Sequence, residues 1–254
     1  MKTRKTVLAW IRETALNVWG GAWSLIAANF LYFLVTLPVQ IWAMIRFNGI
    51  LAEQGGSLFF TVGALAAAVL GRVPVWIRTA VFILDVLLLG PATAALRYAA
   101  SSAVRGRHFW VWPDLKAAAL RNARQAVPVG ILDVLALYGS MTYLLSGGAG
   151  TVPAALRAGW GILAVLYLCF RVPVYDVMVR VELPFSALIK DALIVGLCSP
   201  MRVLLAALFA AAAVFACGYI DLIAEPVFLY ALISTVSSAL FSPVVDRTLL
   251  PGED

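Results

Sequence analysis

The chain has 254 residues, of which 63% are hydrophobic and only 13% are charged, and its formal net charge is +6. Soluble domains are about 45–50% apolar and about 25% charged. This composition therefore excludes a soluble globular protein, a disordered chain and a disulfide-stapled secreted domain. The mean hydropathy of +0.95 indicates a polytopic membrane protein instead.

Membrane-spanning helices set the expected fold class. A helix needs roughly 20 apolar residues to cross about 30 Å of hydrocarbon, so a chain of this length has room for about six to eight membrane segments. We therefore expect an all-α, polytopic transmembrane helix bundle that forms a single integral membrane domain over residues 1–254. The three cysteines and the single histidine are scattered, so no metal site is predicted.

The first half of the chain is predicted to hold one full span and several short apolar segments. The span lies within Thr14–Pro38, because proline removes a backbone donor and ends or kinks a helix. Ile41–Ser57 is interpreted as an external connection. Three apolar segments shorter than a full span follow, and the Gly90-Pro91 pair is expected to separate the last two: Ser57–Gly71, Thr79–Leu89 and Pro91–Val104.

The second half alternates apolar spans with charged segments. The predicted spans are Ala126–Leu145, Pro153–Val172, Met201–Tyr219 and Ala224–Phe241. The segments Arg105–Gln125 and Arg171–Asp191 carry most of the remaining charges and are interpreted as cytoplasmic. Within the second of them, an amphipathic interfacial helix is expected to start near Pro184.

The positive charges predict the orientation. With the N-terminus in the cytoplasm, 17 of the 19 Lys and Arg residues fall on the cytoplasmic side, and only Arg46 and Arg157 fall outside. Cytoplasmic loops of membrane proteins carry such an excess of Lys and Arg. We therefore expect both termini to be cytoplasmic, with a retained first span rather than a cleaved signal peptide.

A motif at residues 87–96 suggests a family. The chain there reads Leu-Leu-Leu-Gly-Pro-Ala-Thr-Ala-Ala-Leu, and a basic, aromatic segment follows before Leu120–Ala126. This pattern resembles the YesL family of bacterial integral membrane proteins, a family of unknown function. Two further stretches resemble the family as well, namely Asn29–Pro38 and Leu183–Ile194.

The chain departs from that family pattern at several points, and the largest departure lies before the Gly-Pro motif. Residues 39–89 intervene between the Leu-Pro end of the first span and the Gly-Pro motif, and they are interpreted as an extra hairpin. Members of the family are often encoded near carbohydrate uptake systems. The resemblance thus implies a multi-pass protein of the bacterial cytoplasmic membrane with an accessory role, and it supplies no catalytic residues.

Two aspartates are candidates for an intramembrane site. Asp133 lies inside a predicted span, where a carboxylate is unfavourable unless it is paired, protonated or hydrated. It could bind a proton or a cation, or it could form an ion pair with Arg97, Arg121 or a neighbouring helix. Asp85 presents the same alternatives in a weaker apolar segment.

The sequence around Gly90 offers a second candidate. Gly90, Pro91 and Thr93 could form a broken-helix site, since backbone groups freed at a helix break bind ions or substrates in transporters. The alternative is a purely structural break that starts a tilted or re-entrant helix.

The third candidate is a surface for lipid or a partner protein. Basic and aromatic side chains alternate there, which suits the headgroup level of a bilayer and attraction to anionic lipid. Docking of a cytoplasmic partner, such as a transporter subunit, is the alternative. We call these residues the basic–aromatic surface: Arg105, Arg107, Trp110, Trp112, Lys116, Arg121 and Arg124.

No signature of catalysis or nucleic-acid binding is present in the sequence. We therefore expect no enzyme activity and no cofactor. The leading hypothesis is a non-catalytic accessory component associated with solute uptake, with carbohydrate as the solute class that the resemblance implies. The alternative hypothesis is a small secondary carrier or channel that uses an intramembrane aspartate.

Overall fold

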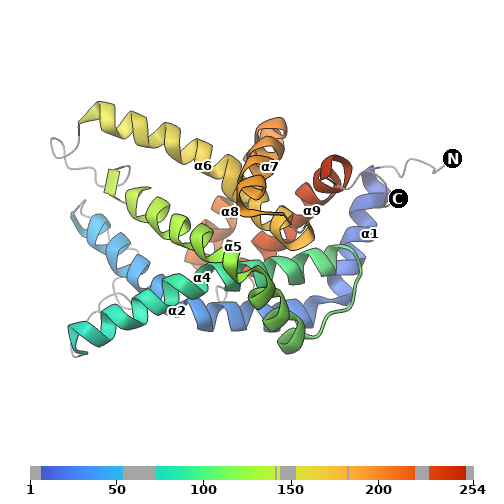
Figure 1. Ribbon diagram of the computed structural model, residues 1–254, viewed down its shortest axis with the longest axis horizontal. Helices are drawn as coiled ribbons and strands as arrows, with labels where there is room; N and C mark the ends of the chain where they lie inside the picture. Colours follow the sequence, from blue (N-terminus) through green and yellow to red (C-terminus); the bar gives the residue numbers. More distant parts are fainter. Residues whose placement is uncertain are drawn as a thin grey trace.

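The structure is a computed structural model, and it describes residues 7–53, 73–140, 142–143, 153–181, 183–220 and 229–249. The described part of the chain is all-α and contains eight helices (Figure 1). They are α1 (Val7–Gly20), α2 (Ala22–Glu53), α4 (Val75–Val104), α5 (Val111–Ser140), α6 (Ala154–Arg180), α7 (Phe185–Cys198), α8 (Pro200–Ile220) and α9 (Tyr230–Leu249). The weak apolar segment Ser57–Gly71 lies outside the described residues.

Several helices are long and apolar enough to cross a bilayer, as a multi-pass membrane protein requires. Three pass this test, namely Ala22–Trp42 within α2, the whole of α4 and the whole of α6. The helix α7 and residues Pro200–Ala213 of α8 also pass together, but they meet at an angle of 91°, so they form either a bent span or a re-entrant loop. The described helices therefore account for three or four of the predicted six to eight segments.

Prolines lie inside several of the described helices without ending them. Five helices continue through a proline beyond their first turn: Pro38 in α2, Pro91 in α4, Pro128 in α5, Pro173 in α6 and Pro243 in α9. The predicted break at Gly90-Pro91 is thus wrong, since α4 runs without interruption through it. Likewise, α2 continues past Pro38 into the expected external connection. In membrane helices such prolines are tolerated because neighbouring helices satisfy the freed backbone groups.

The helix α4 is the centre of the bundle and contacts α1, α2, α5, α6 and α9. Its first half exposes leucine and isoleucine side chains, whereas its second half from Thr93 to Val104 is almost completely buried. Small side chains make this possible, because alanine lets neighbouring helices approach closely on every side. The alanines at the centre of this packing are Ala94, Ala95, Ala99, Ala100 and Ala103.

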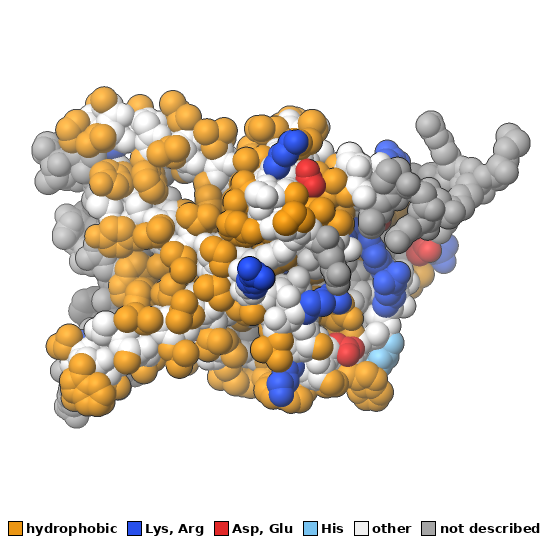
Figure 2. All heavy atoms as spheres, in the orientation of Figure 1, with side chains coloured by type: hydrophobic (Ala, Val, Ile, Leu, Met, Phe, Trp, Pro, Cys, Tyr) orange, Lys and Arg blue, Asp and Glu red, His pale blue; other side chains and the backbone are white. Residues whose placement is uncertain are grey.

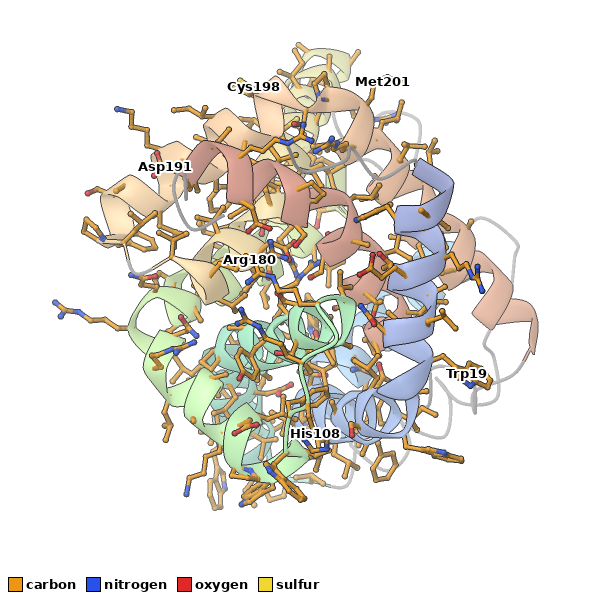
Figure 3. The ribbon with its side chains drawn as sticks, turned by 90° about the vertical axis from the view of Figure 1, so that its right-hand side faces the viewer. Trp19, His108, Arg180, Asp191, Cys198 and Met201 are labelled. Atoms are coloured by element: carbon orange, nitrogen blue, oxygen red, sulfur yellow. The ribbon has the colours of Figure 1, made fainter. Side chains whose placement is uncertain are left out.

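The two ends of the molecule differ in charge. Figure 2 shows a largely hydrophobic half, where α4, α5 and α6 extend, and an opposite half that carries most of the visible Lys and Arg side chains. The α4–α5 and α6–α7 connections lie at this basic end (Figure 1). Viewed end-on in Figure 3, Arg180 lies centrally among the helix ends, while Trp19, His108 and Asp191 lie nearer the periphery.

Two polar contacts fix the connections at the basic end. Asn17 of α1 donates a hydrogen bond to the carbonyl of Val104 over 3.3 Å, and it contacts Gly106, which has a positive φ of 67°. Asp114 accepts a hydrogen bond from the Trp110 amide over 2.8 Å. A carboxylate in the first turn of a helix is favourable, so Asp114 helps to define where α5 begins.

Candidate functional site

Asp133 lies in α5 and pairs with Arg171 of α6. The guanidinium Nε lies 2.5 Å from Asp133 Oδ1, and the side chains are 26% and 11% exposed for Arg171 and Asp133 respectively. Tyr167 and Tyr175, one turn to either side of Arg171, both donate hydrogen bonds to the carboxylate. The guanidinium also lies 4.6 Å from the Tyr175 ring centroid. Asp133 is thus engaged by a neighbouring helix, and its partner is Arg171 rather than Arg97 or Arg121.

A second buried ion pair joins α4 to α6. Arg97 Nη1 lies 3.4 Å from Asp176 Oδ2, and both side chains are almost inaccessible. Arg97 Nη1 also donates to the carbonyl of Ser234 over 3.1 Å, and Ser238 donates to Asp176 over 2.6 Å. Buried charges inside a membrane are usually paired in this way. The pair therefore ties α4, α6 and α9 together.

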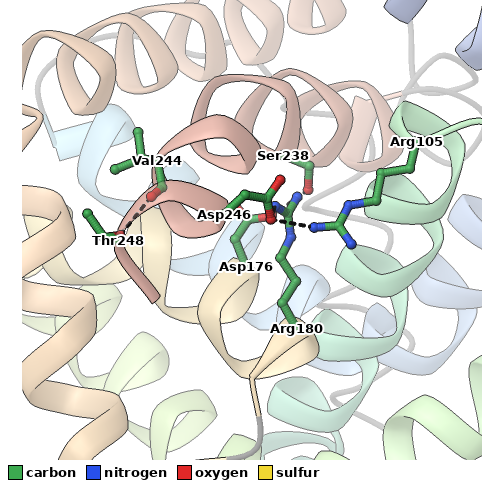
Figure 4. A network of polar contacts seen from close by, with 7 residues as sticks. All are labelled: Arg105, Asp176, Arg180, Ser238, Val244, Asp246 and Thr248. Atoms are coloured by element: carbon green, nitrogen blue, oxygen red, sulfur yellow. Dashed lines mark hydrogen bonds and ion pairs between the residues drawn. The ribbon is translucent and has the colours of Figure 1, made fainter. Parts of the chain in front are cut away.

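A third ionic cluster lies closer to the basic end (Figure 4). Asp246 of α9 accepts a hydrogen bond from Arg105 over 2.7 Å and another from Arg180 over 3.4 Å. Arg180 comes one turn after Asp176 on α6. Consequently α6 presents Arg171 to α5, and both Asp176 and Arg180 to α9.

Asp85 has a different environment from Asp133. It is 2% exposed, and its Oδ2 accepts a hydrogen bond from the Val39 amide over 2.5 Å, while Oδ1 has no hydrogen-bond partner. Val39 directly follows Pro38, where the helical hydrogen-bond pattern of α2 is disturbed. Asp85 therefore satisfies a backbone group next to a proline.

Gly90, Pro91 and Thr93 lie on the face of α4 that meets other helices. A Cβ on Gly90 would lie 1.8 Å from the Ala126 carbonyl oxygen, so only glycine fits at this crossing with α5. Thr93 donates to the Leu89 carbonyl over 2.7 Å and lies 3.4 Å from the Tyr32 hydroxyl. The motif thus serves close packing and does not leave an open helix break.

A pocket lies between the ion pairs. Its volume is about 390 Å³, and it is bounded by α2, α4, α6, α8 and α9. Arg97 and Arg171 both line it, together with hydroxyl-bearing and apolar side chains. The hydroxyl-bearing ones are Tyr32, Thr93, Tyr230, Ser234 and Ser237, and we call this cavity the arginine pocket.

A larger and more apolar pocket of about 730 Å³ lies between α5 and α6. Asp133, Tyr167 and Arg171 form its polar part, and leucines together with Trp160 form most of the rest. Trp160 packs against the backbone at Gly139, where a Cβ would be 1.9 Å from the indole ring. Arg171 and Leu168 line both pockets, so they separate one from the other.

The basic–aromatic surface is found at the α4–α5 connection and on the first turns of α5. Trp110 and Trp112 are 69% and 66% exposed. Arg107, Lys116, Arg121 and Arg124 are exposed as well, whereas Arg105 is engaged by Asp246. The structure therefore leaves six of the seven predicted side chains free to meet lipid headgroups or a partner.

Sequence reasoning missed the pairing of Arg97 with Asp176. The available signal was an arginine inside an alanine-rich helix, because such a helix is expected to be buried on all sides. Within the described residues, no cluster of three or more His, Cys, Asp or Glu side chains could hold a metal ion.

Comparisons of the chain with family models, with curated proteins and with solved structures gave no match.

Proposed function

We propose that the chain is a non-catalytic, multi-pass protein of the bacterial cytoplasmic membrane that acts beside a solute uptake system. Both termini lie in the cytoplasm, and the basic–aromatic surface meets the anionic headgroups of the inner leaflet or a transporter subunit. The likeness of Leu87–Leu96 to the YesL motif supports this role and suggests carbohydrate as the solute class.

One observation carries the proposal, namely the segregation of charge between the two ends. Lys and Arg side chains gather at the end that holds the basic–aromatic surface, while the opposite half is largely hydrophobic (Figure 2). Positive charge accumulates on the cytoplasmic side of membrane proteins, and tryptophan is enriched at headgroup level. An exposed basic–aromatic surface at that depth suits recognition of other molecules at the membrane.

The carrier hypothesis receives less support from the geometry at Asp133. A coupling carboxylate must exchange its proton or ion, but Asp133 is engaged by Arg171, Tyr167 and Tyr175. Asp176 and Asp85 also have partners. The carboxylates of these helices therefore fit a structural role better than a transport role.

A pull-down in mild detergent tests the accessory role. We expect the epitope-tagged chain to retain a defined subunit of a solute uptake system. The triple variant Lys116→Glu, Arg121→Glu, Arg124→Glu should lose that subunit, because it reverses the charge of the exposed surface. The variant Lys190→Glu, at an exposed basic residue on α7, is the matched control and should retain it. Recovery of lipid and self alone would contradict the proposal.

Flux measurements in proteoliposomes test the alternative. If the chain is an accessory protein, wild-type vesicles should show no uptake of sugars, amino acids or cations above empty vesicles. Proton- or ion-coupled flux that Asp133→Asn abolishes, in a variant that remains folded, would instead establish the carrier.

A further inference from the structure

The arginine pocket has the features of a binding site rather than of a packing defect. At about 390 Å³ it is large enough for a small ligand. Apolar cavities stay empty, but a cavity lined by charged and hydroxyl groups is unfavourable unless a polar molecule fills it. Two arginines and several hydroxyls line this one.

The arrangement of charge around the pocket is directional. Arg97 and Arg171 line the cavity, whereas their carboxylate partners, Asp176 and Asp133, are not among its lining residues. Each carboxylate therefore stabilises its arginine from outside the pocket lining. The wall of the pocket is cationic, even though each ion pair is neutral.

Two residues of this lining each have one side-chain donor atom without a hydrogen bond within the protein. Arg97 is 4% exposed and its Nε has no partner, and Ser237 is 3% exposed and its hydroxyl has none. A buried donor without an acceptor is unfavourable, and more so if it is charged. Such donors are satisfied when a ligand supplies oxygen atoms.

Apolar side chains form much of the remaining lining. Among them are Leu168, Val172, Ala206, Ala207 and Ala210, from α6 and α8. A ligand that matches this mixed lining carries an anionic oxygen group next to a less polar part. Guanidinium groups bind phosphate through several parallel hydrogen bonds, which makes phosphate the anion that arginine suits best.

We propose that the arginine pocket binds a phosphate group, which Arg97 and Arg171 hold and Ser237 orients. The phosphate belongs either to a lipid headgroup or to a free phosphate compound. This site is separate from the basic–aromatic surface, so it stands even if the accessory role proposed above fails.

Binding of radiolabelled inorganic phosphate to the purified full chain tests the site. The chain is reconstituted in nanodiscs of phosphatidylcholine, which has no net charge. We expect saturable binding that unlabelled phosphate and sulfate displace and glucose does not. A second arm adds phosphatidylglycerol. Competition by this lipid identifies the headgroup as the source, and its absence identifies a free phosphate compound.

Two alanine substitutions on α8 provide a matched pair. Ala210→Leu fills the pocket without removing a charge, and Ala212→Leu makes the same change at an exposed position that does not line the pocket. Ala210→Leu should weaken phosphate binding at least about tenfold, equivalent to roughly 1.4 kcal/mol. Ala212→Leu should bind as the wild type does.

Two further variants guard against misfolding. Ser237→Ala removes a hydroxyl that has no partner, so the chain should fold normally and bind phosphate several-fold more weakly. The double variant Arg97→Gln, Asp176→Asn removes both members of the ion pair together, so no buried charge is left alone, and it should abolish binding. Wild-type protein without saturable phosphate or phosphatidylglycerol binding would overturn the proposal. Unchanged binding by Ala210→Leu and the double variant would do so too.

Discussion

Gly90 of α4 and Gly130 of α5 pack so closely that neither position has room for a side chain. A Cβ on Gly90 would lie 1.8 Å from the Ala126 carbonyl oxygen, and a Cβ on Gly130 would lie 2.5 Å from the Gly90 nitrogen. Backbones therefore meet directly where these two helices cross. This crossing places Thr93 and Arg97, further along α4, beside the arginine pocket.

Replacing Gly90 by alanine should disrupt that crossing. Because the neighbouring atoms are backbone and cannot move aside cheaply, we expect Gly90→Ala to lower the free energy of unfolding by about 1–3 kcal/mol or more. Unfolding of the purified protein in mixed micelles of increasing dodecyl sulfate content measures this. The control is Gly159→Ala in α6, where a Cβ meets nothing within 4 Å and stability should not fall.

Removing the charge of Asp133 should destabilise the α5–α6 contact. Asp133→Asn leaves Arg171 without its ionic partner, and breaking a fully buried pair costs about 3–5 kcal/mol. We expect about 2–3 kcal/mol here, since the Arg171 side chain is 26% exposed. The double variant Asp133→Asn, Arg171→Gln should recover part of the loss. A double variant as unstable as the sum of both single variants would show that the two groups do not interact.

Adjacent serines on α9 should respond differently to the same change. Ser238 donates a 2.6 Å hydrogen bond to the buried Asp176 carboxylate, whereas the Ser237 hydroxyl has no partner. Hydrogen bonds to charged groups contribute about 1.5–3 kcal/mol. Ser238→Ala should therefore lower the thermal midpoint of the ligand-free protein clearly, and Ser237→Ala should leave it unchanged. Equal effects of both substitutions would speak against the ion-pair geometry.

The start of α9 should depend on a residue from α2. Asn29 is fully buried, and its Oδ1 accepts a 2.6 Å hydrogen bond from the Ala231 amide in the first turn of α9. Loss of such a cap costs about 0.5–2 kcal/mol. Asn29→Ala should accelerate hydrogen exchange in the first turn of α9 more than elsewhere. Asn122→Ala is the control, because Asn122 bonds within its own helix to Ala118 and exchange at α9 should not change.

Some features of this bundle were predictable from the sequence, because they depend on composition and local pattern. The all-α class follows from the abundance of apolar residues and is confirmed, and three or four of the described helices or helix pairs are long and apolar enough to span a membrane. The short helix after Pro184 was also predicted, and α7 begins at Phe185. Pro184 is the N-cap residue of α7, directly before the first helical position.

Other features were not predictable, because they depend on which helices become neighbours. Pro38 and Pro91 are strong local signals of a break, but packing against other helices keeps α2 and α4 continuous. The partner of Asp133 was equally hidden, since nothing local in the sequence relates it to Arg171. Arg97 and Asp176 come from helices that are not consecutive, so only the assembled bundle brings them together.

The central position of α4 has a consequence for how the protein is made. The ribosome completes α4 before it makes Asp176, and well before it makes Ser234 and Ser238 in the final helix. The Arg97 guanidinium therefore enters the bilayer without any of the partners that surround it in the finished structure. A lone arginine at that depth is unfavourable and draws water or headgroups towards itself. We therefore expect α4 to remain beside the translocon or at the interface until α6 and α9 are made and enclose it.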